Sequence, residues 1–101
     1  MKLASLIVNV LLCSAAILTA KPRLIVTTDI GGNPDDTQSM VRLLMYANEF
    51  QIEGFIASAS GTPGELNEAM TRPDLIEERV RAYGQVLPNL LKHNENYPTM
   101  D

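Results

Sequence analysis

The sequence predicts an α/β fold built on parallel strands, and three consecutive segments of the chain support this. The segment RLIVTT, residues 23–28, is a short apolar and β-branched run bounded by Pro22 and by glycines, which is typical of a buried strand covered on both faces. A second run of this kind occupies residues 52–59. The segment between them has apolar residues at helical spacing, namely Met40, Leu43, Leu44 and Ala47. Strand, helix and strand in this order predict one βαβ unit with a right-handed crossover.

The remainder of the chain is predicted to be helical. GELNEAM favours a short helix that Arg72 and Pro73 interrupt, and PDLIEERVRAYG favours a second helix that Gly84 would end. Its inward positions are predicted to be Leu75, Val80 and Tyr83, and VLPNLLKHN favours a further short helical piece. Two parallel strands do not complete a sheet of this class. We therefore expect residues 21–101 to be the N-terminal part of a larger domain and inactive alone.

The first segment of the chain, MKLASLIVNVLLCSAAILTA, has the order of a secretory signal peptide. Lys2 precedes a long apolar run that ends in small residues, which predicts cleavage after Ala20 and a mature chain that begins at Lys21. The alternative is a membrane anchor, because the run approaches the roughly 20 residues that a spanning helix needs. Asn9 and Ser5 dilute the run, so we predict a signal peptide over residues 1–20, a secreted or periplasmic protein and no stable membrane anchor.

Composition excludes several classes of function. The formal net charge is -4 and no basic patch is visible, so nucleic acid is not an expected partner. The single Cys13 rules out an internal disulfide and offers no cluster of thiolates for a metal. His93 lies between Lys92 and Asn94 in a polar segment, and we expect it at the surface.

The stretch TTDIGGNPDD, residues 27–36, directly follows the first strand and carries Asp29, Asp35 and Asp36. Carboxylates gathered in one turn repel one another unless a cation or a substrate compensates. Ligands of open α/β sheets bind outside the carboxyl ends of strands, which is where this turn lies. Oxygen ligands without Cys or a nearby His favour a hard cation, calcium or magnesium. The alternative is a helix cap made by Asp35 or Asp36, with Asn33 as a turn residue, but capping does not explain Asp29.

Two familiar motifs do not fit this stretch. An EF-hand loop starting at Asp29 would place Pro34 where glycine is needed and Met40 where glutamate is needed. A dinucleotide fingerprint would need a third glycine, and the carboxylates would repel a pyrophosphate.

Three blocks of the sequence resemble a known family. The blocks are RLIVTTDIGGNPDDTQSMVRLL, IEGFIASASGTPGE and AYGQVLPNLLKHNENYPT, and they occur in this order over nearly all of residues 21–101. They are similar to the nucleoside-hydrolase-like domain of secreted bacterial proteins described as cellulose-binding, within the nucleoside hydrolase superfamily. The resemblance implies a Rossmann-like parallel sheet in a three-layer domain, of which this chain holds the N-terminal βαβ part.

The resemblance also implies roles for the three aspartates. Nucleoside hydrolases bind calcium with the Asp at the strand end and the second Asp of the pair, which correspond to Asp29 and Asp36. The strand-end Asp is also the base toward the attacking water, so Asp29 is the implied catalytic residue. The first Asp of the pair holds ribose hydroxyls, so Asp35 is the implied substrate-binding residue. Calcium in such a site activates and orients water, and cleavage passes through an oxocarbenium-like transition state.

Two functions are implied by this resemblance. The first is a secreted, calcium-dependent hydrolase-like domain that acts on N-glycosyl (nucleoside-like) or related sugar compounds, with a small sugar or nucleoside-like substrate, or a polysaccharide, as its partner. The second is a non-catalytic carbohydrate-binding (cellulose-binding) module with the same fold. Thr27 stands where the superfamily pattern has a further Asp, and Ser60 to Thr62 stand where it has an active-site Asn, so both hypotheses stay open.

Overall fold

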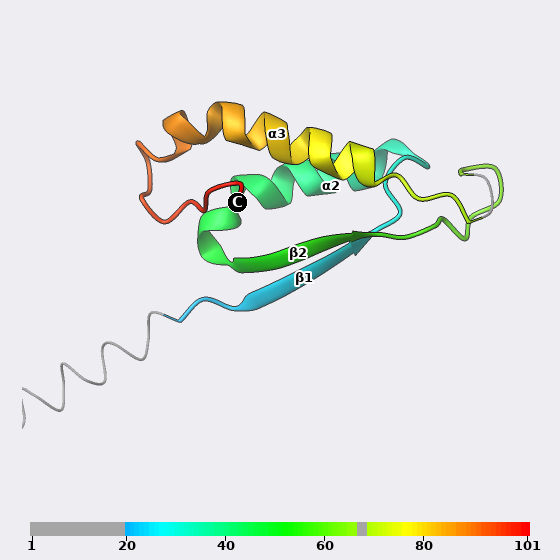
Figure 1. The fold of residues 1–101 in the computed structure, drawn as a ribbon, viewed down its shortest axis with the longest axis horizontal. Coiled ribbons are helices and arrows are strands. Elements are labelled where there is room, and N and C mark those ends of the chain that lie inside the picture. The colour runs from blue at the N-terminus through cyan, green and yellow to red at the C-terminus, as the bar shows by residue number, and fades with distance from the viewer. Residues whose placement is uncertain (1–19, 67–68) are drawn as a thin grey trace, which may run out of the picture.

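The computed structural model describes residues 20–66 and 69–101, and it contains a two-stranded parallel sheet with helices packed against it (Figure 1). The elements in chain order are β1 (Arg23–Thr28), α2 (Pro34–Met45), the 3-10 helix η1 (Ala47–Glu49), β2 (Gln51–Ala57) and α3 (Pro73–Leu90). The parallel pairing of β1 with β2 around α2 confirms the predicted α/β fold and its βαβ unit. Except for Ala20, the predicted signal peptide lies outside the described residues.

Among the helices that the structure describes, none is both long enough and apolar enough to cross a membrane.

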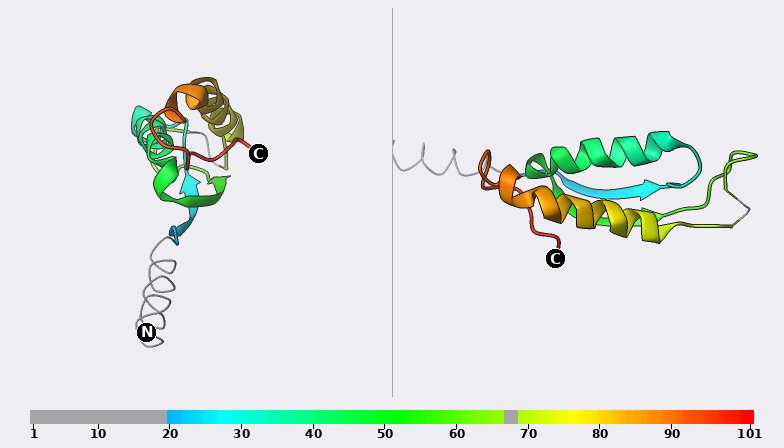
Figure 2. Two further views of the ribbon diagram at one scale, coloured as in Figure 1. Left: turned by 90° about the vertical axis from the view of Figure 1, so that its left-hand side faces the viewer. Right: turned by 90° about the horizontal axis from the view of Figure 1, so that it is seen from above.

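Both helices cover the same face of the sheet, and they lie side by side on it (Figure 2). Side chains of β1 alternate between half-buried and exposed along the strand. Ile25 is 63% exposed and Ile56 of β2 is 52% exposed, because both belong to the face that no described helix covers. The prediction that the strands are covered on both faces is therefore wrong for the described residues, since α3 packs beside α2 instead of on the opposite face.

The register of the two strands shifts between Leu24 and Ile25, where β2 carries one extra residue, Glu53. The shift places Ile52 and Phe55, which are three positions apart, both on the side of the helices, opposite Leu24 and Val26. The carboxylate of Glu53 accepts a 2.7 Å hydrogen bond from the Nε of Arg23 at the solvent-exposed start of β1. This pair is exposed, so its contribution to stability is small.

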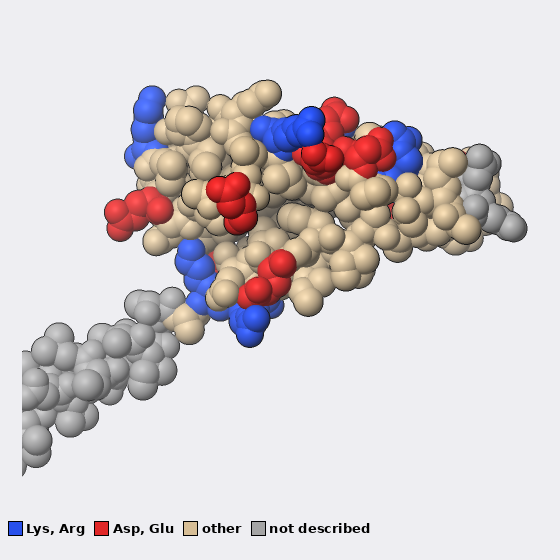
Figure 3. Space-filling model, viewed as in Figure 1, with Lys and Arg blue, Asp and Glu red and all other residues tan. Residues whose placement is uncertain are grey.

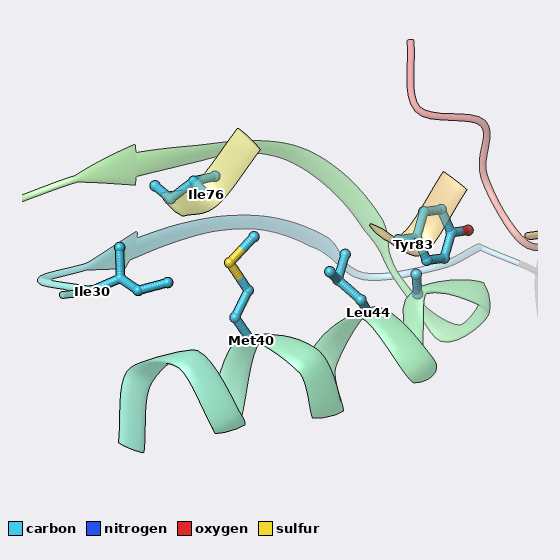
Figure 4. Packing of buried hydrophobic residues seen from close by; sticks show 6 residues of the cluster. Ile30, Met40, Leu44, Ile76 and Tyr83 are labelled. Atoms are coloured by element: carbon cyan, nitrogen blue, oxygen red, sulfur yellow. The ribbon is translucent and has the colours of Figure 1, made fainter. Parts of the chain in front are cut away.

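The core lies between the sheet and the helices. Met40 and Leu44 are four residues apart and so share one face of α2. Figure 4 shows both side chains directed from α2 toward the strands. With Ala47, they confirm the predicted inward positions of this segment, while Leu43 is half-buried. The complete set of buried hydrophobic residues is Ile30, Met40, Leu44, Ala47, Ile76 and Tyr83.

Helix α3 supplies the opposite side of this core. Tyr83 is buried as predicted, and Leu75 and Val80 are partly buried against the core. The second buried residue of α3 is Ile76, two turns before Tyr83, which the sequence analysis did not single out. The hydroxyl group of Tyr83 donates a 2.7 Å hydrogen bond to the carbonyl oxygen of Pro98. This bond connects the C-terminal segment to α3.

The predicted end of this helix at Gly84 is wrong, as is the separate helical piece after it. α3 runs without a break from Pro73 through Gly84 and Pro88 to Leu90. Pro88 has no N–H to donate to the carbonyl of Gly84, so the helix continues with one hydrogen bond fewer. Gly84 does not end the helix, and Met100 packs against it. A Cβ built at Gly84 would overlap the Sδ of Met100, so the missing side chain leaves room for the C-terminal segment.

The helix predicted from GELNEAM is absent from the described part of that segment, which excludes residues 67 and 68. Gly64 has a φ of 86° and Ala69 has a φ of 58°. Both values belong to the left-handed region, which does not continue a right-handed helix. The segment instead forms turns that lead from β2 to Pro73, which opens α3 as its first residue.

Charged side chains of both signs alternate over α3 in Figure 3. They include the Arg81–Glu77 pair one helical turn apart and the neighbouring Arg79–Glu78 pair. Such exposed pairs on one helix face contribute little to stability.

Candidate functional site

The acidic turn lies at the carboxyl end of β1 and is anchored from within by Ile30. Ile30 is 0% exposed and is part of the core formed with α2 and α3, although it stands between Asp29 and Gly31 in a polar stretch. Burying this side chain fixes the backbone on either side of it. Asp29 is therefore held at the strand end, as the sequence predicts, while its carboxylate stays half-buried.

Gly31 lets the chain turn away from this anchor. Its φ is 108°, which strongly favours glycine, and a Cβ there would lie 3.0 Å from the Cγ of Arg72 and 3.1 Å from the Cδ1 of Leu75. The start of α3 thus covers the turn closely. Two independent demands, backbone conformation and space, act on the same residue.

The N-cap of α2 is Asn33, not Asp35 or Asp36 as the sequence analysis proposed. The Oδ1 of Asn33 accepts a 3.2 Å hydrogen bond from the backbone N–H of Asp35. The reason is Pro34, which occupies the first helical position and so moves the cap to the residue before it. Both aspartates lie in the first turn, where their negative charge complements the helix dipole.

The structure brings Asp29 and Asp36 together and leaves Asp35 apart. The Thr28 hydroxyl donates a hydrogen bond to the Oδ2 of Asp36, which turns this carboxylate toward the strand end. Asp35 is exposed, and its Oδ1 accepts a 2.9 Å hydrogen bond from the backbone N–H of Asp36. Two of the three predicted site residues therefore share one location, and the third lies one position away at the entrance of α2.

The pKa of the Asp29 carboxyl is raised above its ordinary value. Its hydrogen-bonding interaction with the Asp36 carboxyl is the largest cause, followed by partial removal from water and by repulsion from the Asp36 charge. Hydrogen bonds from the backbone of Asp29 and from the Ser60 side chain act in the opposite direction. The two carboxyl groups therefore lie near each other. A bound cation would offset the repulsion between their charges.

A second wall of the site comes from the loop after β2, which leaves the sheet at the same end as the acidic turn (Figure 1). Ser60 donates a 2.6 Å hydrogen bond to the Oε2 of Glu65. The Nδ2 of Asn33 donates a 2.7 Å hydrogen bond to the Oε1 of the same glutamate. The sequence analysis did not identify Glu65. In the sequence, only the place of Glu65 at the end of the block IEGFIASASGTPGE draws attention to it. Its contact with Asn33 joins residues that are 32 positions apart, which a local pattern does not predict.

The donor set suits a hard cation. Asp29 and Asp36 offer carboxylate oxygens, and Thr28 and Ser60 offer hydroxyl oxygens beside them. Such all-oxygen sets are what calcium and magnesium prefer. Within residues 20–66 and 69–101, no group of three or more His, Cys, Asp or Glu side chains converges as a metal-binding set. Two aspartates alone would supply only part of the roughly six to eight oxygens that calcium takes.

An open groove of about 290 Å³ runs beside Asp36 between β1 and α2. Val26, Met40 and Leu43 give it a mostly apolar surface, and its polar lining comes from Thr27, Thr28, Asp36 and Ser39. His93, by contrast, is exposed beyond the end of α3, as the sequence predicts.

A family model described as "Cellulose-binding Sde182, nucleoside hydrolase-like domain" matches residues 23–101. The chain belongs to this family. The match confirms the resemblance and spans every element of this nucleoside hydrolase-like domain that the structure describes, including the acidic turn and the Ser60–Glu65 loop. No curated protein and no solved structure matches the chain.

We expect Ile30→Ala to destabilise this nucleoside hydrolase-like domain strongly, because it removes a fully buried side chain and leaves a cavity under the acidic turn. The expected loss is about 2–5 kcal/mol in the free energy of unfolding, measured by urea denaturation of the intact protein. The matched control is Ile25→Ala at a 63% exposed position, with an expected change of about 0.5 kcal/mol or less. Equal losses in the two variants would contradict the anchoring role of Ile30.

Proposed function

We propose that this chain carries the cation- and sugar-binding turn of a secreted, calcium-dependent hydrolase-like domain that acts on N-glycosyl (nucleoside-like) or related sugar compounds. The observation that carries the proposal is the Asp29–Asp36 pair at the carboxyl end of β1, where ligands of parallel sheets bind. Family membership supports it, because the matched family is described as nucleoside hydrolase-like.

In this proposal Asp29 and Asp36 are the residues that hold calcium. Thr28 fixes the direction of the Asp36 carboxylate, and the buried Ile30 fixes the position of Asp29. When calcium is bound, it lowers the pKa of the water molecule that it holds. Asp29 is the proposed base toward that water, because it lies at the carboxyl end of β1 beside Asp36.

Asp35 is the proposed contact to sugar hydroxyls. It is exposed in the first turn of α2, next to the pair, and its carboxylate keeps acceptor capacity beyond the bond from the Asp36 N–H. In this proposal, one sugar contacts Asp35 and the cation held by Asp29 and Asp36.

Calcium binding tests the proposed ligands directly. In calorimetric titration of the intact protein with calcium chloride, we expect Asp29→Asn and Asp36→Asn each to weaken binding by about tenfold or more, since each removes a charged oxygen ligand. Glu49→Gln is the control, because it removes one charge from η1, before the first residue of β2 and so at the opposite end of the strand from the site. If all three variants bind calcium as the wild type does, the ligand assignment is wrong.

A second candidate function is non-catalytic binding of cellulose, which the description of the matched family favours. The two candidates differ in what the acidic pair does. For the hydrolase-like domain, we expect the Asp29→Asn/Asp36→Asn double variant to lose release of base from a panel of nucleosides and retain sedimentation with microcrystalline cellulose. A wild-type protein that binds cellulose but releases no base from any nucleoside would favour the binding module.

The proposed secretion has its own test. The exported protein is expected to begin at Lys21, because small residues precede that position and suit a signal peptidase. Edman sequencing of the protein recovered outside the cytoplasm gives the first residue. Recovery of a chain that still begins at Met1 and partitions with the membrane would support the anchor instead.

A further inference from the structure

The strongest unassigned feature is the carboxylate of Glu65, which joins two segments that are distant in sequence. One oxygen accepts the 2.7 Å hydrogen bond from Asn33 in the turn after β1, and the other accepts the 2.6 Å bond from Ser60 in the loop after β2. Each bond involves a charged acceptor, which makes it stronger than a bond between neutral groups. A single half-buried side chain therefore connects both walls of the candidate site.

The acidic turn leaves room for this side chain at Gly32. A Cβ built at Gly32 would lie 2.6 Å from the Oε2 of Glu65 and 3.0 Å from its Cβ. The positive-φ glycines of the described residues are Gly31 and Gly64, so the backbone of Gly32 does not itself require glycine. Space for Glu65 is the physical reason for a glycine at this position.

The two hydrogen-bond partners of Glu65, Asn33 and Ser60, belong to the acidic turn and to the loop after β2. Asn33 uses its amide nitrogen for Glu65 and its amide oxygen for the backbone N–H of Asp35, so the same side chain caps α2 and contacts the loop. Ser60 accepts a 3.2 Å hydrogen bond from the N–H of Thr62 and donates its one hydroxyl proton to Glu65. A change at Glu65 therefore affects both the cap of the helix that carries Asp36 and the loop that carries Ser60.

We propose that Glu65 is a positioning residue, which holds the turn after β1 and the loop after β2 in the one arrangement that places Asp29 and Asp36 together. It acts through Asn33 and Ser60 by hydrogen bonding and is not a cation ligand. The calcium part of its test rests on the proposed function, whereas the structural part does not.

Glutamine at position 65 separates hydrogen bonding from charge. Its amide oxygen can accept from the Nδ2 of Asn33, and its amide nitrogen can donate to the hydroxyl oxygen of Ser60. Glu65→Gln therefore keeps both walls joined but removes the negative charge, while Glu65→Ala removes both properties. Gly32→Ala is a further variant, since the added methyl displaces Glu65 without altering its chemistry.

Hydrogen–deuterium exchange of the intact protein, read by mass spectrometry, provides the structural measurement. In Glu65→Ala and Gly32→Ala, we expect amide exchange in the peptide over residues 33–40 to rise by about tenfold, as expected when a charge-assisted bond to the helix cap is lost. Exchange in the peptide over residues 74–90 should stay unchanged. Glu65→Gln and the control Glu49→Ala should exchange like the wild type in both peptides.

Calcium chloride titration gives the second measurement. We expect Glu65→Ala to weaken calcium binding by about tenfold and Glu65→Gln to restore it to within about twofold of the wild type, because position is kept although charge is lost. A Glu65→Gln protein as weak as Glu65→Ala would assign the effect to charge and overturn the positioning role. Faster exchange in both peptides, or in neither, after Glu65→Ala would overturn it as well. A wild type that binds no calcium would count against the proposed function alone, since the exchange measurement still decides the role of Glu65.

Discussion

The burial of Ile30 is the constraint on which the rest of the site depends. This residue stands in the middle of a polar turn, yet its side chain is fully enclosed by the core that α2 and α3 form over the sheet. The backbone of the turn cannot shift without exposing it. Asp29 and the start of α2 are therefore placed by hydrophobic packing, which acts independently of any ligand.

Polar contacts then complete what this anchor begins. Two carboxylates brought together raise the free energy of the turn, which appears as the raised pKa of Asp29. The hydroxyl of Thr28 directs one of them, and the cap at Asn33 fixes the helix from which it comes. Glu65 connects this turn to the second loop, so hydrogen bonds hold in place a pair that charge repulsion alone would separate. Such preorganisation suits a site that meets a cation or a sugar.

The two faces of the sheet have different surroundings. The face toward α2 and α3 carries the half-buried residues of both strands, and the register shift at Glu53 keeps Phe55 on that side. The opposite face presents Ile25 and Ile56 to solvent. The carboxyl ends of the two parallel strands meet at one edge, and this brings the two loops of the site together.

The sequence by itself determined the local parts of this protein. β1, the βαβ unit and the place of Asp29 and Asp36 follow from short apolar runs, helical spacing and glycines, which act over a few neighbouring residues. The tertiary structure decided the passage of α3 through Gly84, the uncovered sheet face and the contacts of Glu65. These features depend on which segments meet in space. Gly84 adjoins Met100, and Asn33 meets Glu65 across 32 positions, so no local pattern encodes either contact.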